Sequence, residues 1–335
     1  MSRAAVEIDA ARIDGPEAFR RLVVDPCRPV VLRGAVRDWP LARVAAAGGS
    51  ALGEYLARFD AGRVVEAFVG DAAIAGRYTY SDDLSGFNFR RETMRLTQAV
   101  ARIVDDRPGD ETLYIGSLPI PLVLPGLAEE LPLAFAPPGA APRIWIGHAS
   151  TVACHYDMMD NLACVVAGRR RFTLYPPDAI GDLYVGPIDH NMAGQPVALA
   201  AEAEPDDPNF PRFERARDRA IEIELAAGDA LYMPKLWWHR VEASGALNIL
   251  VNYWWDAFPV GADQPFATLL LAMSAIADRP EAERAAWRAW FDHYVFRPDG
   301  HPLAHLPEDR HGVLATSAEN RGILRAHAMR MLRGS

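Results

Sequence analysis

The region from residue 143 to residue 254 contains many short apolar stretches, separated by turns that contain Gly, Pro or Asp. Strands are predicted at 143–147, 151–157, 162–167, 170–175, 220–225, 230–233, 238–242 and 247–254. A parallel sheet needs long crossover connections, usually helices, and the region shows no such alternation of strand and helix. Short strands between tight turns are typical of a sandwich or a barrel. The region therefore predicts a mainly β fold.

Helical patterns flank this β region on both sides. Helices are predicted at 14–24, 40–60 and 91–104, and strands at 29–33, 63–70 and 112–116. The proline-rich run 119–142 predicts a connection with at most a short helix. From residue 263 onward, apolar residues recur at helical spacing. We predict three parts, namely an N-terminal segment 1–110 that packs on the barrel, a core 111–257 with an insertion at 181–216, and C-terminal helices 258–335.

Composition and charge argue against several classes of protein. With a formal net charge of −9, the chain lacks the excess of basic residues that binds the phosphate backbone of nucleic acids, so no nucleic-acid partner is expected. The three cysteines, without CxxC spacing, argue against a disulfide framework or a cysteine zinc cage. The N-terminus has no apolar signal segment, and the apolar stretches 246–255 and 266–277 are too short to span a bilayer. We expect a cytoplasmic protein with no membrane partner.

Three polar side chains in the β region have the chemistry of a metal site. His155 and Asp157 lie two residues apart on a predicted strand, so they project from one face while Tyr156 points away. His239 lies on a later predicted strand, which antiparallel pairing could bring alongside. Two imidazoles and one carboxylate with open positions are the ligand set of non-haem Fe(II) oxygenases.

Other interpretations of these residues stay open from the pattern alone. A His-x-Asp pair arises easily by chance in a chain with nine histidines. His239 follows two tryptophans, where a histidine is more often packed in a core. His148 and the pair Asp189-His190 are rival ligands, which we rank lower because they lack the strand context.

Three blocks of sequence, in order, carry a family resemblance. The first is PVVLRGA (29–35) with Asp38-Trp39-Pro40, the second is HYDMMDNLACVVAGRRRFTLYPP (155–177), and the third is GDALYMPKLWWHRVE (228–242) with NILVNYWW (248–255). Over residues 28–257 the chain resembles the Jumonji C (cupin-like) family of Fe(II)- and 2-oxoglutarate-dependent oxygenases. In motif it is most similar to the asparaginyl hydroxylase that modifies hypoxia-inducible factor, and to its bacterial relatives. The resemblance implies a double-stranded β-helix, or jelly roll, with flanking helices.

The resemblance also implies roles for individual residues. His155, Asp157 and His239 match the catalytic iron triad, which works with 2-oxoglutarate and O2. Four further residues match the lining of the cosubstrate site, namely Tyr114, Asn161, Asn252 and Trp254.

Two positions depart from the family pattern. Arg170 stands where close relatives carry a lysine that pairs with the far carboxylate of 2-oxoglutarate. A guanidinium can bind that carboxylate with two hydrogen bonds, although Arg170 could also be surface charge. Val152 stands where a threonine is expected, and a bulge could bring Thr151 or Ser150 inward. We therefore expect Thr151 and Arg170 to bind the far carboxylate.

The activity implied is the oxidative decarboxylation of 2-oxoglutarate to succinate, coupled to hydroxylation of a protein side chain or a small molecule. The alternative is a metal-binding cupin-like protein without oxygenase activity, acting as a sensor or scaffold. Relatives dimerise through C-terminal helices, so a homodimer through these helices is expected by resemblance. Ordinary packing of these helices within one chain is the alternative.

Overall fold

The computed structural model describes residues 5–81, 83, 85–105, 111–135, 139–188, 196–204, 207–261 and 263–334. The chain divides into two compact units, Met1–Ala257 and Phe258–Ser335. The strands all belong to the first unit. They are β1 (Val6–Asp9), β2 (Val30–Arg33), β3 (Val64–Asp71), β4 (Arg77–Tyr78), β5 (Arg90–Arg95), β6 (Glu111–Pro119), β7 (Pro142–Gly147), β8 (Ser150–His155), β9 (Asp160–Tyr175), β10 (Ile221–Ala226), β11 (Ala230–Met233) and β12 (Trp238–Trp255).

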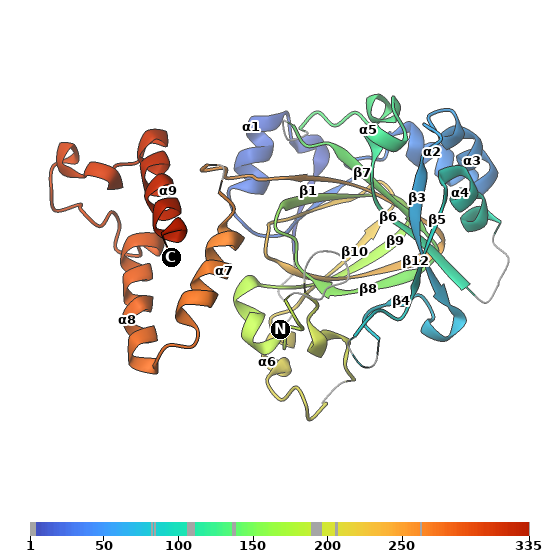
Figure 1. Ribbon diagram of the computed structural model, residues 1–335. Helices are drawn as coiled ribbons and strands as arrows, with labels where there is room; N and C mark the ends of the chain where they lie inside the picture. Colours follow the sequence, from blue (N-terminus) through green and yellow to red (C-terminus); the bar gives the residue numbers. More distant parts are fainter. Residues whose placement is uncertain are drawn as a thin grey trace. The chain divides into compact units, whose positions relative to one another are not determined.

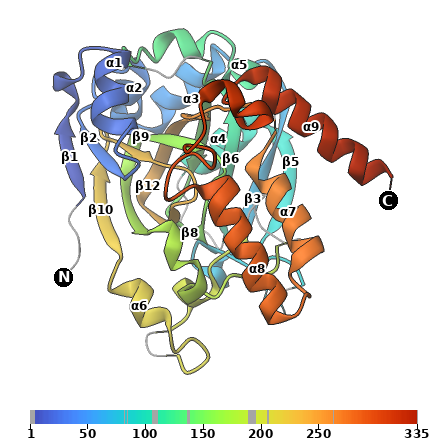
Figure 2. The same ribbon diagram turned by 90° about the vertical axis from the view of Figure 1, so that its left-hand side faces the viewer.

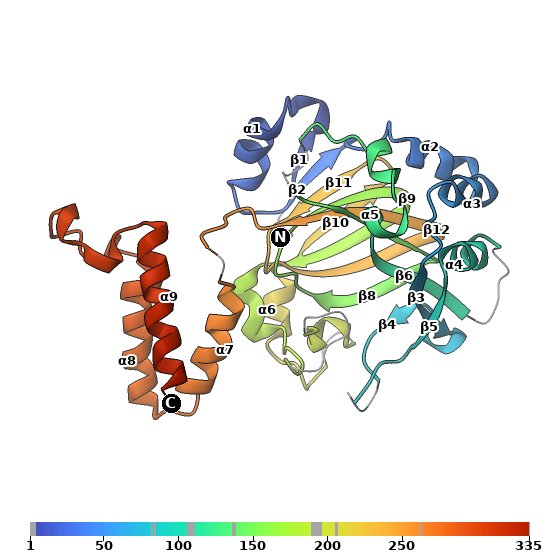
Figure 3. The same ribbon diagram turned by 45° about the horizontal axis from the view of Figure 1, so that its top comes forward.

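These strands form one curved sheet that folds back on itself (Figures 1 and 3). The order along the main path is β1-β2-β11-β9-β12-β7-β6-β3-β5, with β10 on β9 and β8 between β12 and β4. Strand β12 pairs with β8 along its first half and with β7 along its second half, and it follows β9 along most of its length. The mainly β prediction is confirmed, and the architecture is that of a jelly roll with flanking helices.

The two longest strands each join two of the predicted strands. The predicted segments 162–167 and 170–175 are parts of β9, and 238–242 and 247–254 are parts of β12. At Gly168 of β9 the backbone has a φ of 74°, and the register between β9 and β12 shifts between Ser244 and Ile249. A Cβ at Gly168 would lie 2.1 Å from Oδ1 of Asn248. Such irregularities bend strands, which lets β9 and β12 contribute to both halves of the curved sheet.

The helices of the first unit are short. They are α1 (Pro16–Phe19), which continues as a π-helical turn Arg20–Val24, α2 (Pro40–Ala47), α3 (Gly49–Ala57), α4 (Leu96–Val104), α5 (Ile120–Val123) and α6 (Phe213–Arg217). Single 3-10 turns occupy Ala10–Arg12, Ala72–Ile74, Leu127–Glu130, Pro177–Asp182 and Leu199–Glu202. The predicted helix 40–60 is two helices, because Gly48 adopts a φ of 113° between α2 and α3. Leu41, Leu52 and Leu96 from three of these helices are fully buried in the core that they share with the sheet.

The predicted helix 91–104 is wrong in its first turn. Residues Arg90–Arg95 form β5, which pairs with β3, and α4 begins only at Leu96. Strand β5 lies at the end of the sheet order and its sequence, RRETMR, is mostly charged. Its side chains pair with oppositely charged neighbours, as Arg90 does with Asp71 and Glu111. An edge strand held by ion pairs lacks the apolar alternation that marks a half-buried strand.

The second unit is helical, as its helices in Figure 2 show. It contains α7 (Pro265–Ile276), α8 (Glu281–Phe291) with a π-helical turn Asp292–Phe296, 3-10 turns at Glu308–Arg310 and Gly312–Leu314, and α9 (Ala318–Arg333). None of α7, α8 and α9 contains a buried residue. An ion pair of 2.7 Å between Arg325 Nε and Asp263 Oδ1 ties α9 to the segment before α7. Among the described helices of the whole chain, none has the length and apolar character needed to cross a bilayer.

Candidate metal centre and its cavity

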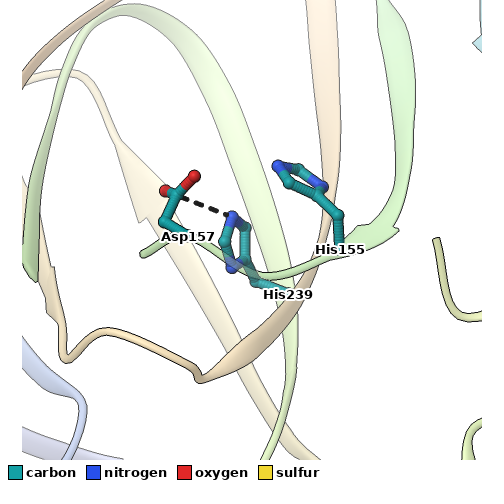
Figure 4. A group of neighbouring side chains, drawn as sticks. All are labelled: His155, Asp157 and His239. Carbon is teal, nitrogen blue, oxygen red and sulfur yellow. Dashed lines mark ion pairs between the residues drawn. The ribbon is translucent and has the colours of Figure 1, made fainter. Parts of the chain in front are cut away.

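The three predicted metal ligands meet at the end of β8 and the start of β12. His155 is the last residue of β8, and His239, the second residue of β12, lies directly opposite it in the ladder. One ligand atom from each of His155, Asp157 and His239 lies within 4.8 Å of the others. Figure 4 shows the three side chains converging, with Nε2 of His239 at 3.8 Å from Oδ2 of Asp157.

Asp157 is not on a strand, because β8 ends at His155 rather than at residue 157. Other contacts hold it in place. The N–H of Leu236, in the turn between β11 and β12, donates to the backbone carbonyl of Asp157 at 2.9 Å. The side-chain amide of Asn161 donates to Asp157 Oδ2 at 3.1 Å, which fixes the carboxylate from the side of β9. The aspartate is therefore positioned by two separate elements.

The backbone sets the tautomer of both histidines. Nδ1 of His155 lies 2.8 Å from the carbonyl oxygen of Ala153, and Nδ1 of His239 lies 3.0 Å from that of Trp237. A carbonyl only accepts, so each Nδ1 carries the proton and each Nε2 presents a lone pair. Burial, together with the neighbouring His155, lowers the pKa of His239 to about 4. Both imidazoles are therefore oriented as neutral ligands, in the way that second-shell carbonyls orient metal-binding histidines.

The insertion supports this centre from outside. The carbonyl of Cys154 accepts from the N–H of Ala198 at 2.7 Å, and the N–H of Cys154 donates to Glu202 Oε1 at 3.0 Å. Both partners come from the predicted insertion 181–216, so its described part covers the edge of β8 next to His155. None of the described residues 181–188, 196–204 and 207–216 lines the cavity beside the triad.

The rival ligands are not part of the centre. His148 uses both ring nitrogens, since Nδ1 accepts from the N–H of Leu113 at 3.0 Å and Nε2 lies 3.1 Å from the carbonyl oxygen of Ile103. Asp189 and His190 lie outside the described residues. Within the described ranges, the triad is the one group of three or more metal-ligating side chains that converge.

The triad opens into a cavity of about 580 Å³ inside the curved sheet. Aromatic side chains form much of its wall, and their rings contact one another: Tyr114 lies 5.8 Å from Tyr78 and 5.9 Å from Trp145, measured between ring centroids. Tyr78 of β4 and Phe89, just before β5, also line the cavity. The cavity is thus a mostly apolar pocket with a few polar groups, as is usual for a small-molecule site.

Arg170 and Tyr114 form one part of this cavity, which we call the anion end. Arg170 is only 3% exposed, and its Nε has no hydrogen-bond partner within the described chain. Burial lowers the pKa of Arg170, and the Tyr114 hydroxyl is its electrostatic neighbour. A buried cation without a counter-ion is unfavourable, and a carboxylate bound in the cavity would compensate it. The alternative that Arg170 is surface charge is wrong, because the side chain is buried and lines the cavity.

Asn161, Asn252 and Trp254 also line the cavity. The Nδ2 of Asn252 donates to Oδ1 of Asn161 at 3.4 Å, and its own Oδ1 accepts from Nε1 of Trp145 at 2.8 Å. A hydrogen-bonded path therefore runs from Trp145 through the two asparagines to Asp157. The Nε1 of Trp254 is buried without a partner among the described residues.

The structure does not bring Thr151 into the cavity. His239 lies opposite His155 and Val241 lies opposite Val152, so β8 has an extra residue between these two pairs. That bulge points Val152 to the same side as His155, and Val152 lines the cavity. Because neighbouring side chains alternate, Thr151 points away and pairs in register with Arg77 and Glu242.

Arg143 and Trp145 are among the cavity residues that were missed from the sequence. Both lie on β7 and alternate with the buried Ile144 and Ile146. The alternation was visible in the predicted strand 143–147, and it would have placed an arginine on the inner face. Sequence reasoning passed over it because Arg143 belongs to none of the matching blocks.

The comparisons with known proteins agree with this geometry. The profile of the cupin-like domain family matches residues 16–261. The human bifunctional peptidase and (3S)-lysyl hydroxylase JMJD7 is 28% identical over 277 residues, covering 72% of this chain and 81% of that protein. The Jumonji C domain-containing protein 5 of Drosophila melanogaster is 26% identical over 275 residues, covering 76% of this chain and 62% of that protein.

A third relative matches over a shorter stretch. The lysine-specific demethylase JMJ31 of Arabidopsis thaliana is 38% identical over 116 residues, which are 34% of this chain and 21% of that protein. The chain thus spans only a part of two of these three relatives. The more specific likeness to the asparaginyl hydroxylase stays a prediction. The match over most of the chain, together with the jelly roll and its His-Asp-His centre, shows that the chain belongs to the cupin-like (Jumonji C) domain family.

Proposed function

We propose that this chain is an Fe(II)- and 2-oxoglutarate-dependent oxygenase that couples the decarboxylation of 2-oxoglutarate to succinate with hydroxylation of a substrate. One observation carries the proposal: the converging triad opens into a cavity that also contains Arg170, a buried arginine whose Nε has no partner among the described residues. The donor set suits Fe(II), and Arg170 suits a carboxylate. The relatives' names, a lysyl hydroxylase and lysine-specific demethylases, support a protein side chain rather than a small molecule as the substrate.

The residues of the chain have separable tasks in this proposal. His155, Asp157 and His239 would hold Fe(II) through three ligand atoms and leave its other positions open. Bound iron and 2-oxoglutarate would together supply the oxidising chemistry with O2. Arg170 and the Tyr114 hydroxyl would hold the far carboxylate of 2-oxoglutarate, and the aromatic wall would exclude water.

The alternative is a metal-binding cupin-like protein without oxygenase activity. A relative that has lost the reaction would be expected to lose a ligand or to fill the cavity with side chains. Here the three ligand atoms converge, both histidine tautomers are set for metal binding, and the cavity is open. These observations favour the oxygenase.

The test is the visible spectrum of the anaerobic protein with Fe(II), before and after addition of 2-oxoglutarate. We expect a weak metal-to-ligand charge-transfer band in the wild type and no band in Asp157→Ala. Succinate production under O2 would follow the same pattern. Iron binding without a band at saturating 2-oxoglutarate would contradict the proposal and favour the non-catalytic alternative.

A homodimer and a cytoplasmic location are also part of the proposal. The C-terminal helices expose large apolar side chains, including Leu270 on α7, Trp290 on α8 and Ile323 on α9. Exposed apolar surface of this extent usually marks an interaction site, and a second copy would cover it. Sedimentation of the full chain should give a dimer that Trp290→Glu dissociates; a monomeric wild type would contradict this. The free, mostly buried cysteines suit a reducing compartment.

A further inference from the structure

Arg143 lies in the same cavity as the triad and has no role in the function proposed above. We propose that Arg143 binds an anionic group of the substrate, so that the cavity selects a carboxylate-bearing side chain over lysine. The inference rests on the proposed function and names the substrate class for its site.

The guanidinium of Arg143 is held in place by neutral groups. Its Nε donates to Oγ of Ser117 at 2.6 Å, and its Nη2 donates to the carbonyl oxygen of Ser117 at 2.5 Å. Its Cζ lies 5.5 Å from the centroid of the Trp254 ring. The side chain is partly buried, and burial alone lowers its pKa, since no carboxylate of the described residues lies close enough to raise it. The arginine is therefore oriented but not neutralised.

The backbone of β6 is distorted at the point where it holds Arg143. The register between β6 and β7 shifts between Ile115 and Leu118, and Ser117 within this bulge has a φ of 54°. A left-handed conformation is unfavourable for a residue with a Cβ. Here it allows both the hydroxyl and the carbonyl of Ser117 to meet the guanidinium. Strain of this kind persists at sites where surrounding contacts determine a functional geometry.

The charges of the cavity leave Arg143 uncompensated. Among the described lining residues Asp157 is the one carboxylate, whereas three arginines line the cavity, namely Arg91, Arg143 and Arg170. Arg91 lies at an exposed position and pairs with Glu66 at 3.4 Å. In the loaded site, the two charges of Fe(II) and the charge of Arg170 would balance Asp157 and the dianionic 2-oxoglutarate. Arg143 then remains as a positive charge that a substrate carboxylate would neutralise.

Arg143 also lies on the metal side of the cavity, away from the anion end. It pairs in register with Asn252 of β12, whereas Arg170 pairs with Ala243 on the other side of the irregularity in β12. Asn252 contacts Asn161, which donates to the metal ligand Asp157. Because residues directly opposite in antiparallel strands project from one face, the Arg143 side chain shares a face with Asn252. An anionic group bound there would lie on the side of the metal centre.

A lysine substrate does not suit this arrangement. Its ammonium group would enter a cavity whose single described carboxylate is a metal ligand, and it would meet the charge of Arg143. Like charges in a partly desolvated site disfavour binding. The chain would therefore differ in substrate class from the relatives named for lysine.

The test measures binding of capped pentapeptides of alanine with aspartate, glutamate, asparagine or lysine at the centre. Calorimetry would use the full chain, loaded anaerobically with Fe(II) and 2-oxoglutarate. We expect an acidic peptide to bind at least about tenfold more tightly than the asparagine and lysine peptides, since a charged hydrogen bond carries the difference. Arg143→Met should abolish this preference and Arg143→Lys should restore part of it. Arg171→Met, which removes an equal charge from a surface pair with Glu222, is the matched control and should leave the preference intact.

The charge-transfer band separates the possible failures. A normal band in the wild type with no preference for an acidic peptide overturns the inference and leaves the proposed function standing. A band in Arg143→Met that needs much more 2-oxoglutarate, with an unchanged peptide preference, also overturns it, because Arg143 would then anchor the cosubstrate. If the wild type gives no band, the proposed function fails and the inference fails with it.

Discussion

The two ends of the cavity satisfy their polar groups in opposite ways. At the metal end both histidines, the carboxylate of Asp157 and the amide of Asn161 have protein partners within 3.1 Å. At the anion end Arg170 is buried, and its Nε has no hydrogen-bond partner among the described residues. The metal end is therefore preorganised by the fold, whereas the anion end is completed only by a ligand. A substitution at the anion end should lower 2-oxoglutarate affinity without lowering stability. A substitution at the metal end should lower both metal affinity and stability.

The largest expected effect is at the anion end. Arg170→Met should weaken 2-oxoglutarate binding about 100-fold, because charged hydrogen bonds to the far carboxylate are lost. The same change should leave the free energy of unfolding of the unloaded protein unchanged or raise it by about 1 kcal/mol, since it removes an uncompensated buried charge. Titration of the charge-transfer band and urea unfolding measure the two quantities. A loss of more than about 2 kcal/mol of stability would show that Arg170 has a structural partner.

Asn161→Ala tests the metal end. The change removes the donor that fixes Asp157 and an acceptor for Asn252. Metal affinity should fall about tenfold, as is common for second-shell partners, and the free energy of unfolding should fall by about 1 kcal/mol. Competition between the protein and a chelator for Co(II) would measure the affinity. Equal metal affinity in variant and wild type would mean that the Leu236 contact alone positions the aspartate.

Leu236→Gly is a smaller change on the same side. Leu236 has a φ of 69° and its side chain is 42% exposed, so a glycine would relieve backbone strain with little loss of burial. Relief of the strain stabilises the folded state, and the greater entropy of the unfolded chain with glycine offsets part of this gain. The net rise in the free energy of unfolding should be about 0.5 kcal/mol. Thermal unfolding of the unloaded protein measures this, with 2-oxoglutarate affinity as the property that should not change. A marked loss of stability would show that the Leu236 side chain packs in the native turn.

Thr151→Val should have the smallest effect. Its side chain points away from the cavity, so 2-oxoglutarate affinity should stay unchanged and stability should change by less than about 0.5 kcal/mol. The band titration provides the measurement, with Arg170→Met as the reference for a residue of the anion end. A tenfold loss of affinity would instead place the Thr151 hydroxyl on the cosubstrate, as the sequence suggested.

The mainly β fold was accessible from the sequence because strand periodicity is a local signal, whereas the jelly roll and the complete metal triad were predicted from the family resemblance. The continuity of β9 and β12 could not be predicted, because a glycine such as Gly168 usually marks a turn between two strands. Only long-range pairing with the neighbouring strands makes it a bend within one strand. Strand β5 was predicted as part of a helix because its residues do not alternate between apolar and polar. Ion pairs with neighbouring strands, rather than a buried apolar face, hold it at the edge of the sheet. Tertiary hydrogen bonding fixes Asp157 beyond the end of β8, where strand geometry no longer applies.

The inner face of β7 shows a different limit. Arg143 and Trp145 alternate with buried isoleucines, so their common face could be predicted, but their neighbours could not. The partner of Arg143 is Ser117, a serine in a bulge of β6. No sequence pattern predicts that its backbone adopts the left-handed conformation. For Arg170 the sequence left two environments open, and only its burial decides between them.

Strand β9 carries both Asn161, beside the metal ligand Asp157, and Arg170, at the anion end. The separation of these two contact points is therefore set by one bent strand that is hydrogen-bonded to neighbours on both sides. Because this pairing holds the strand on both sides of its bend, the separation should not adapt to the ligand. The cavity should accordingly discriminate among keto diacids by length, and one with a methylene more or fewer than 2-oxoglutarate should bind at one end only.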